Sequence, residues 1–527
     1  MDMLLVIIAI STYYATSVNA TKILLIPGNI NSHVMYFSRL GVDLAKLGNV
    51  ATVIAPSNAR VPDFATDNVE NFTYLKYPVE KATPFANSPE MSEMMIRVAM
   101  TTSLVQRIRV MLEFTADGVR ESEQDCTRLL DNVQTMQQIR EARYDFAIMD
   151  MLGAVGCYST IPYSLGMSHG MLSLSLATLH LFRLPRLASF PNPLSLSDPP
   201  TFFERLTALF INGMSPTDLS DNRYFMEKYA SNRPYIDMLE FLRRQSLWFY
   251  LEDLSVNYPL PQMPNTVAVG DIIVGAKVRP LSSEIKAFVS RSKHGVIIVS
   301  FGSFCDFFPP AITQRLCEAF TKLTTRFGLS VIWKLKAEGI CRNDNILILP
   351  WIPQNDLLAD SRVKLFISHG GFNSVIESVY HSKPLLIFPI ALDQPANAAA
   401  AVSKGFAIQM NIADFSSESL VSNIHKLITD PTYERNASLA SAILRDRRDT
   451  AAQRVSVMID HVIKYGDRHL RTGAFELSTL QFMMFDIFAA LFAAAAVVFL
   501  TVTLCCCCVY RYCFRRGTSS QEKLKSQ

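Results

Sequence analysis

Short runs of β-branched and apolar residues recur along the chain, and segments with helical spacing of apolar positions separate them. Runs of this length predict buried strands, and strands that alternate with helices predict parallel sheets in an α/β fold. The runs form two groups on either side of a less regular stretch, from residue 183 to about 280, that is rich in proline and aromatic residues. We therefore expect two domains, residues 21–275 and 276–470, because 527 residues exceed the usual size of one core. The predicted strands are Lys22–Ile26, Ala51–Ala55, Phe146–Met149, Val296–Phe301, Val331–Leu335, Val363–Ser368 and Pro384–Phe388.

Both ends of the chain carry long apolar segments. Residues 1–20 hold an apolar run followed by small residues, which predicts a signal peptide that is cleaved before Thr21. Residues 487–510 contain no charge and are long enough to cross a hydrocarbon core of about 30 Å as a helix. The tail, residues 511–527, is basic, so the positive-inside rule places it in the cytoplasm and the bulk of the chain in the lumen. Because the tail holds the positive excess, the net charge of +3 does not indicate a nucleic-acid partner.

Further local features agree with a lumenal location in the secretory pathway. Asn71 and Asn436 each begin a sequon for N-glycosylation. Lys525 and Lys523, three and five residues from the C-terminus, resemble the lysine-based retrieval signal of endoplasmic-reticulum membrane proteins. A solvated basic tail is the alternative interpretation of these lysines.

The cysteines fall into two groups. Those near the membrane, Cys505–Cys508 and Cys513, could be S-acylated or could serve as apolar filler in a helix. The lumenal ones are odd in number and widely spaced, which does not indicate a disulfide framework and leaves any pairing open. These are Cys126, Cys157, Cys305, Cys317 and Cys341.

Polar residues and glycines are concentrated between Trp351 and Gln394. A predicted strand there ends at Ser368, and the next residues, His369 and the glycine pair Gly370–Gly371, open the following helix. The glycines allow the backbone to approach a ligand closely, and the N–H groups and dipole of a helix N-terminus attract anions. The segment is therefore suited to bind a diphosphate.

This array resembles the signature of the UDP-glycosyltransferase family, and more closely its membrane-bound UDP-glucuronosyltransferase branch, over the whole chain. The resemblance implies a GT-B fold, in which two Rossmann-like domains face each other across a cleft, with one C-terminal transmembrane helix in the endoplasmic-reticulum membrane. It implies an acceptor-binding N-terminal domain and a C-terminal domain that binds a UDP-sugar as co-substrate. By resemblance, Trp351 stacks on uracil, Gln354 and Glu377 contact uridine, Asp393 and Gln394 contact the sugar, and Ser303, His369, Gly371, Asn373 and Ser374 surround the diphosphate. Lys334 is either a cationic diphosphate contact or a solvated lysine at a strand end.

His33, in the loop after the first predicted strand, lies where this family carries its general base. Asp150 ends another predicted strand, so both residues are expected at the carboxyl edge of one parallel sheet, where α/β folds place their sites. A carboxylate beside a neutral imidazole fixes its tautomer and stabilises the imidazolium. Asp145 is a structural alternative at the wrong end of the strand, and His169 is interpreted as an ordinary polar loop residue.

The activity implied is inverting transfer of a sugar, glucuronic acid in the first instance, to a hydroxyl of a lipophilic small molecule, which gives a β-glycoside. The motifs require neither a metal nor a cofactor. Leu251 stands where glucuronosyl-transferring relatives carry an Arg for the sugar carboxylate, which leaves UDP-glucose as an alternative donor. A catalytically idle lumenal partner of a related transferase is a further alternative, and a homo- or hetero-oligomer is possible.

Overall fold

The computed structural model describes residues 20–28, 31–59, 61–62, 69–79, 89–101, 104–151, 155–173, 201–203, 222–260, 262–275, 277–302, 308–336, 340–482 and 484–525. The predicted signal peptide, apart from Ala20, lies outside these residues, as do Ser303 and Cys305.

Seven parallel strands of the described chain form a first sheet in the order β3-β2-β1-β4-β5-β6-β7. Its central strands are buried, as expected of β-branched and apolar runs that helices cover on both faces. Edge strand β3 instead has exposed and partly buried positions, and its last residue, Tyr77, is buried. The strands are β1 (Lys22–Ile26), β2 (Val50–Pro56), β3 (Phe72–Tyr77), β4 (Phe146–Asp150), β5 (Ser168–Ser173), β6 (Leu247–Tyr250) and β7 (Thr266–Ala268).

A second parallel sheet of six described strands has the order β10-β9-β8-β11-β12-β13. The chain moves outward from β8 in both directions, so the ends of β8 and β11 lie at a switch point of the sheet, where open α/β sheets bind ligands. The strands are β8 (Val296–Ser300), β9 (Ser330–Lys334), β10 (Ile346–Leu349), β11 (Val363–Ser368), β12 (Leu385–Ile387) and β13 (Ala407–Gln409).

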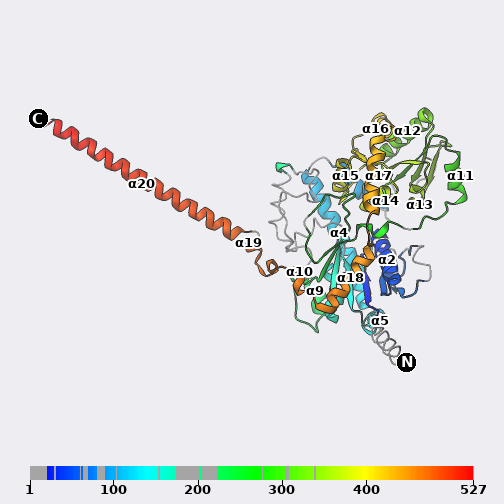
Figure 1. Cartoon of the computed structure of the whole chain (residues 1–527), viewed down its shortest axis with the longest axis horizontal. Helices are drawn as coiled ribbons and strands as arrows, with labels where there is room; N and C mark the ends of the chain where they lie inside the picture. The colour runs from blue at the N-terminus through cyan, green and yellow to red at the C-terminus, as the bar shows by residue number, and fades with distance from the viewer. Residues whose placement is uncertain are drawn as a thin grey trace, which may run out of the picture. The chain divides into compact units, whose positions relative to one another are not determined.

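Helices connect the strands in both halves (Figure 1). Several begin at side chains that accept a backbone N–H, such as Asp237, Ser282 and Thr450, and α12 ends at Gly328 with a positive φ of 64°. In the first half they are α2 (Asn31–Lys46), α3 (Pro89–Met100), α4 (Leu104–Asp131), α5 (Val133–Ala142), α6 (Val155–Tyr158), α7 (Thr160–Leu165), α9 (Arg223–Tyr229), α10 (Met238–Arg243) and the 3-10 helix η3 (Gly270–Ile273). The later helices are α11 (Ser283–Arg291), α12 (Pro310–Phe327), α13 (Gln354–Leu358), α14 (Phe372–Tyr380), α15 (Gln394–Ser403), α16 (Ser417–Thr429), α17 (Pro431–Arg445), α18 (Ala451–Tyr465), η4 (Arg468–Leu470), η5 (Gly473–Glu476), α19 (Thr479–Phe482) and α20 (Phe485–Lys525).

Helix α18 returns from the second half of the chain to the first half. It contacts α2, η3, β6 and β7, and Figure 1 shows it beside the first sheet. Asn49 Nδ2 donates to Ser456 Oγ at 3.0 Å, and Thr21 Oγ1 donates to Asp460 Oδ1 at 2.8 Å. Helix α18 therefore completes the domain with which the chain begins.

The predicted strands have counterparts in the structure. The stretch from residue 183 to about 280, for which no strand was predicted, differs from the expectation. It contributes β6 and β7 to the first sheet. His169 is a second correction, because it lies inside β5 and is buried instead of lying in a polar loop. The predicted boundary at residues 275 and 276 falls between β7 and β8.

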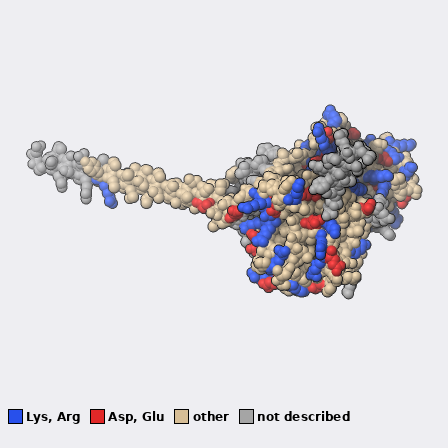
Figure 2. All heavy atoms as spheres, turned by 60° about the horizontal axis from the view of Figure 1, so that its bottom comes forward, with Lys and Arg blue, Asp and Glu red and all other residues tan. Residues whose placement is uncertain are grey.

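Residues 472–527 form a separate unit. Its long helix, α20, contains an apolar segment, Phe485–Tyr512, of 28 residues that could cross a membrane and that includes the predicted span. Figure 2 shows charged atoms of this helix only near the ends of its coloured part, whereas both signs are interspersed on the compact part of the chain.

Two disulfides link the four described cysteines that precede α20. Cys126 of α4 pairs with Cys157 of α6, and Cys317 of α12 pairs with Cys341. The described cysteines thus form two isolated bridges. This is not the dense framework of a disulfide-stapled domain, which the sequence did not indicate either.

Candidate active site

His33 and Asp150 meet at the carboxyl edge of the first sheet. Strands β1 and β4 pair side by side, so the start of α2 and the end of β4 are neighbours. His33 Nδ1 donates to Asp150 Oδ2, which also accepts the N–H of Gly28 at 2.9 Å. Both side chains are buried. With Nδ1 held as the donor, Nε2 carries the lone pair that a general base needs.

The two alternatives to this pair have other roles. Asp145, at the opposite end of β4, accepts the backbone N–H of Lys22 at 2.8 Å. His169 stacks on Phe241 with ring centroids 4.9 Å apart, and its Nδ1 donates to the Met167 carbonyl at 2.9 Å. Burial lowers the pKa of His169 to about 4, so the residue is a neutral part of the core.

Tyr36 is a residue beside this pair that the sequence patterns did not identify. It follows His33 by one turn of α2, and the two ring centroids are 4.9 Å apart. Its hydroxyl is buried and has no hydrogen-bond partner within the described part of the chain. Burial first, and then the charges of Asp150 and Asp393, raise its pKa well above the usual value, so Tyr36 is neutral at physiological pH.

Asp393, in the second half of the chain, lies near His33. Its carboxylate accepts a hydrogen bond from Asn397 Nδ2 at 2.7 Å and another from the backbone N–H of Phe372 at the start of α14. Burial raises its pKa, and the proximity of His33 lowers it. The predicted sugar contact and the predicted base are therefore close enough to interact electrostatically.

Gln394, the other predicted sugar contact, is buried and holds the neighbouring turn. Its Oε1 accepts the N–H groups of Ile390 at 2.8 Å and Ala391 at 3.0 Å. The side-chain carbonyl oxygen of Gln394 thus stabilises the loop before α15. The amide nitrogen is then the group of this side chain that is available to a sugar.

The predicted uridine contacts come together on α13 and α14. Gln354 Nε2 donates to Glu377 Oε2 at 2.5 Å. Burial raises the pKa of the Glu377 carboxyl to about 7, the nearby charge of Asp356 adds to this, and the Gln354 hydrogen bond opposes it. Trp351, just before α13, is 53% exposed, which is unusual for so large an apolar side chain and suits a stacking surface.

The predicted diphosphate site lies around His369 and the N-terminus of α14. Gly302 and Gly371 both approach the His369 ring so closely that a Cβ on either would lie 2.6 Å from Nε2. Gly370 has a φ of +84°, a conformation that other residues rarely adopt. Burial and the charge of Lys334 lower the pKa of His369 to about 4, so it would contact a diphosphate as a neutral hydrogen-bonding group.

Lys334 is buried, which contradicts its interpretation as a solvated lysine. Its Nζ donates to the Gly302 carbonyl at 2.8 Å and lies 5.8 Å from the ring centroid of Trp351. Asn373 and Ser374 occupy the first turn of α14, where partial positive charge from the helix dipole adds to that of the lysine.

Leu251 does not face this site. It is 1% exposed and packs in the core with Val256 and Val267. The position at which the resemblance expects a cation for the sugar carboxylate is therefore part of the hydrophobic interior.

Comparisons with known proteins agree with this geometry. A profile of the family described as UDP-glucoronosyl and UDP-glucosyl transferase matches residues 21–520. UDP-glucuronosyltransferase 2A3 of Cavia porcellus is 28% identical over 475 residues, which cover 88% of this chain and 88% of that protein. A 2-hydroxyacylsphingosine 1-beta-galactosyltransferase of Mus musculus is 26% identical over 487 residues, or 89% of this chain and 85% of that one.

Solved structures support the fold. Spinosyn forosaminyltransferase SpnP superimposes with a TM-score of 0.56 at 14% identity, covering 84% of this chain and 99% of that chain. This similarity and the two parallel sheets confirm the GT-B architecture. Since the family profile spans nearly the whole chain and its motif residues converge on one site, the chain belongs to the UDP-glucoronosyl and UDP-glucosyl transferase family and is a UDP-sugar-dependent glycosyltransferase.

Proposed function

We propose that the chain transfers a hexose from a UDP-sugar to a hydroxyl of a lipophilic small molecule, with inversion at the anomeric carbon. The acceptor oxygen forms a bond to that carbon as the bond to the UDP oxygen breaks, and the electron pair leaves with the diphosphate. The acceptor proton goes to His33 Nε2, and Asp150 stabilises the resulting imidazolium.

One observation carries this proposal: the His33 and Asp150 pair lies close enough to Asp393 of the donor-side half to influence its pKa. With the base on one half and the sugar contact on the other, the acceptor would approach the reacting carbon from the side of the first half, and UDP would leave toward the second. That placement supports a single displacement with inversion, because the nucleophile approaches from the face opposite to UDP.

Two donors are candidates. The burial of Leu251 and the carboxylate of Asp393 favour a neutral hexose such as glucose, because neither group can pair with a sugar carboxylate. The galactosyltransferase among the relatives supports a neutral sugar as well. UDP-glucuronate is the second candidate, supported by the relative named as a glucuronosyltransferase.

The proposed setting is the endoplasmic-reticulum membrane, with the two sheets in the lumen and α20 as a single span. The apolar segment Phe485–Tyr512 and the lysines near the C-terminus support this topology. Lipophilic acceptors partition into membranes, so a membrane anchor keeps the enzyme close to them.

The test compares His33→Ala and Asp150→Asn with the wild type in permeabilised microsomes, with 1-naphthol as the acceptor and UDP-glucose, UDP-glucuronate or UDP-galactose as donors. Loss of the base should lower the turnover rate about 10²- to 10⁴-fold while donor affinity stays within about twofold. His425→Ala, at an exposed position of α16, is the matched control and should leave the rate unchanged.

Two outcomes would count against the proposal. Equal rates for His33→Ala and the wild type would show that His33 is not the base. Donor binding without turnover by the wild type, with any of the three donors and a panel of phenols and sterols, would favour the alternative of an idle partner.

A further inference from the structure

Tyr36 lies one helical turn after His33 on α2, and the two side chains are in contact. Residues three apart lie on the same face of a helix, and helical side chains lean toward the N-terminus, so the Tyr36 ring extends toward His33. The ring centroids are 4.9 Å apart and the ring planes are tilted by 44°. The imidazole of the proposed base therefore has an aromatic neighbour.

The contact between the two rings is buried and confined. His33 is 5% exposed and Tyr36 is 1% exposed. Tyr36 also packs against Phe37, with ring centroids 5.4 Å apart, and belongs to the core cluster that contains Leu40. His33 makes a second contact through Nδ1, which donates to Asp150. The imidazole therefore cannot turn without breaking this hydrogen bond or displacing a packed aromatic ring.

The hydroxyl of Tyr36 is not the part of the side chain that acts on the reaction. Its oxygen is enclosed by protein and has no hydrogen-bond partner within the described part of the chain. Burial first, and then the charges of Asp150 and Asp393, raise its pKa well above the usual value, so the hydroxyl stays protonated. A hydroxyl that is enclosed and stays neutral neither contacts a substrate nor transfers a proton. The aromatic ring is then the part of Tyr36 that can influence catalysis.

The proposed reaction creates a cation at this contact. When His33 takes the acceptor proton it becomes a buried imidazolium, and burial disfavours a charge unless nearby groups stabilise it. The carboxylate of Asp150 is one such group. The π electrons of an aromatic ring also attract a cation within about 6 Å of the ring centroid, and the attraction is stronger where water is excluded. The separation of 4.9 Å between His33 and Tyr36 lies within this range.

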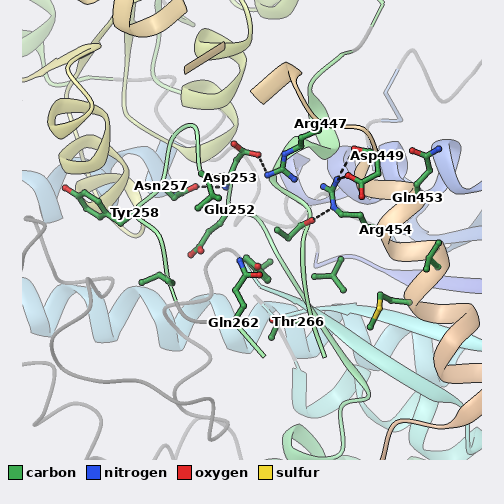
Figure 3. Close-up of a pocket in the computed structure, with 17 residues that line it drawn as sticks. Glu252, Asp253, Asn257, Tyr258, Gln262, Thr266, Arg447, Asp449, Gln453 and Arg454 are labelled. Carbon is green, nitrogen blue, oxygen red and sulfur yellow. Dashed lines mark hydrogen bonds and ion pairs between the residues drawn. The ribbon is translucent and has the colours of Figure 1, made fainter. Parts of the chain in front are cut away.

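The arginines that line a cavity of about 520 Å³ belong to a different part of the chain. Figure 3 shows Arg447 beside Asp253 and Arg454 beside Asp449, and an ion pair joins each of these two pairs of residues. The base and its aromatic neighbour are not among the described residues that line this cavity. Both arginines are thus already paired with carboxylates, and the cavity is separate from the contact between the base and Tyr36.

We propose that Tyr36 is a positioning residue for the transfer step and that it acts through His33. Its ring holds the imidazole against Asp150 and stabilises the imidazolium that forms as the acceptor loses its proton. No bond to Tyr36 forms or breaks, because the proton goes from the acceptor oxygen to His33 Nε2 and the electron pair of the broken anomeric bond leaves with UDP. The inference rests on the proposed function, in which His33 is the general base.

The test removes the hydroxyl and the ring of Tyr36 separately. The purified full chain in phosphatidylcholine nanodiscs is assayed at 25 °C with 1-naphthol and the donor that gives turnover in the wild type, and calorimetry measures the Kd for UDP. Tyr36→Phe keeps the ring, and Tyr36→Leu replaces it by an aliphatic side chain. Tyr74→Leu is the matched control, because Tyr74 of β3 contacts the same helix, where its hydroxyl donates to Ser38 Oγ at 2.7 Å.

We expect Tyr36→Leu to lower kcat about 3- to 30-fold, because the imidazolium loses its aromatic neighbour. The KM for the donor and the Kd for UDP should stay within about twofold, which shows that the donor half remains folded. Tyr36→Phe and Tyr74→Leu should retain at least about half of the wild-type kcat. A Tyr36→Leu protein with the wild-type kcat, or a Tyr36→Phe protein as slow as Tyr36→Leu, would overturn the assignment of the ring.

A double-mutant cycle separates an effect through His33 from a general loss of structure. In the His33→Ala background, Tyr36→Leu should cause no further loss of rate, because the imidazole on which the ring acts is absent. An equal fold-loss in both backgrounds would show that Tyr36 acts on the structure alone, and would overturn the inference. A wild-type rate for His33→Ala would refute the proposed function and this inference with it, whereas a slow His33→Ala protein beside a fast Tyr36→Leu protein would refute the inference only.

Discussion

Glu377 gives the transferase site a pH dependence that can be measured without turnover. The residue lies on α14, where Gln354 Nε2 donates to its carboxylate at 2.5 Å and burial raises its pKa to about 7. As the pH rises through this value the carboxyl loses its proton, and only the ionised form can accept hydrogen bonds from both ribose hydroxyls while Gln354 remains bound. Donor affinity should therefore be gained above pH 7 and lost below it.

The size of the effect follows from the fraction of Glu377 that is ionised. With a pKa of about 7, the carboxylate is about nine-tenths ionised at pH 8 and about one-tenth at pH 6. If donor binding requires the ionised form, the Kd for the donor should rise about tenfold as the pH falls from 8 to 6. Hydrogen bonds to a charged group contribute about 1.5–3 kcal/mol, so Glu377→Gln should weaken binding about 10- to 150-fold at pH 8.

The assay is calorimetric titration with UDP-glucose from pH 6.0 to 8.5. The intact UDP-sugar is preferable to UDP, since a terminal phosphate itself titrates near pH 6. Glu377→Gln should give weak binding with no pH dependence, and Glu284→Gln, an exposed control on α11, should retain the wild-type profile. A flat wild-type profile, or the same slope in the Glu377→Gln protein, would refute the reasoning.

Other features of the chain lead to shorter predictions. Asn71→Gln should remove a glycan that endoglycosidase H detects on gels, because Asn71 is exposed in a turn. Asn436→Gln should remove none, because the Nδ2 of Asn436, a residue of α17, donates to the carbonyl of Gly405 at 3.0 Å. A single glycan that disappears in the Asn436→Gln protein would contradict this. Lys334→Met should raise the Kd for UDP-glucose about tenfold, whereas Lys336→Met, at an exposed position, should not. Turnover should be unchanged by EDTA, and restoration by Mg²⁺ of activity lost in EDTA would refute a metal-free mechanism.

The sequence predicted what depends on local patterns and on the geometry of parallel sheets. His33 and Asp150 are 117 residues apart, yet His33 lies soon after β1 and Asp150 ends the neighbouring β4, so the edge of the sheet brings them together. Helix α14 likewise begins at the predicted glycine pair after β11. In both cases the end of a strand and the turn after it were sufficient to predict the position of the feature.

Features that depend on contacts between distant segments could not be predicted in this way. Strand β7 has only three residues, so its pattern is too short to recognise, and it is defined by pairing with β6. The disulfide between Cys126 and Cys157 requires α4 to pack against α6. Lys334, at the end of β9, donates to the carbonyl of Gly302, 32 residues earlier, a contact that its own strand pattern does not indicate.

The donor array also illustrates the limit of motif residues as evidence of contact. Gln394 occupies a motif position, but its carbonyl oxygen holds the turn of Ile390 and Ala391, so part of its role is structural. Tyr36 occupies no motif position, yet it contacts His33 and is influenced by Asp393. Which side chains complete the site is decided by packing around the motif as well as by the motif.

The contact of α18 with α2 implies that the proposed base, His33, depends on a helix near the end of the first unit of the chain. Ile459 of α18 is fully buried in the core cluster that contains Leu40 and Leu44 of α2, the helix that carries His33. Ile459→Ala should leave a cavity there and lower the thermal unfolding midpoint by about 3 °C or more, since such truncations cost about 2–5 kcal/mol. Turnover should fall at temperatures at which donor binding is still intact, because α2 loosens before the donor half. Val457→Ala, at an exposed position two residues away, should change neither quantity. Equal loss of donor binding and turnover in the Ile459→Ala protein would show instead that the two halves unfold together.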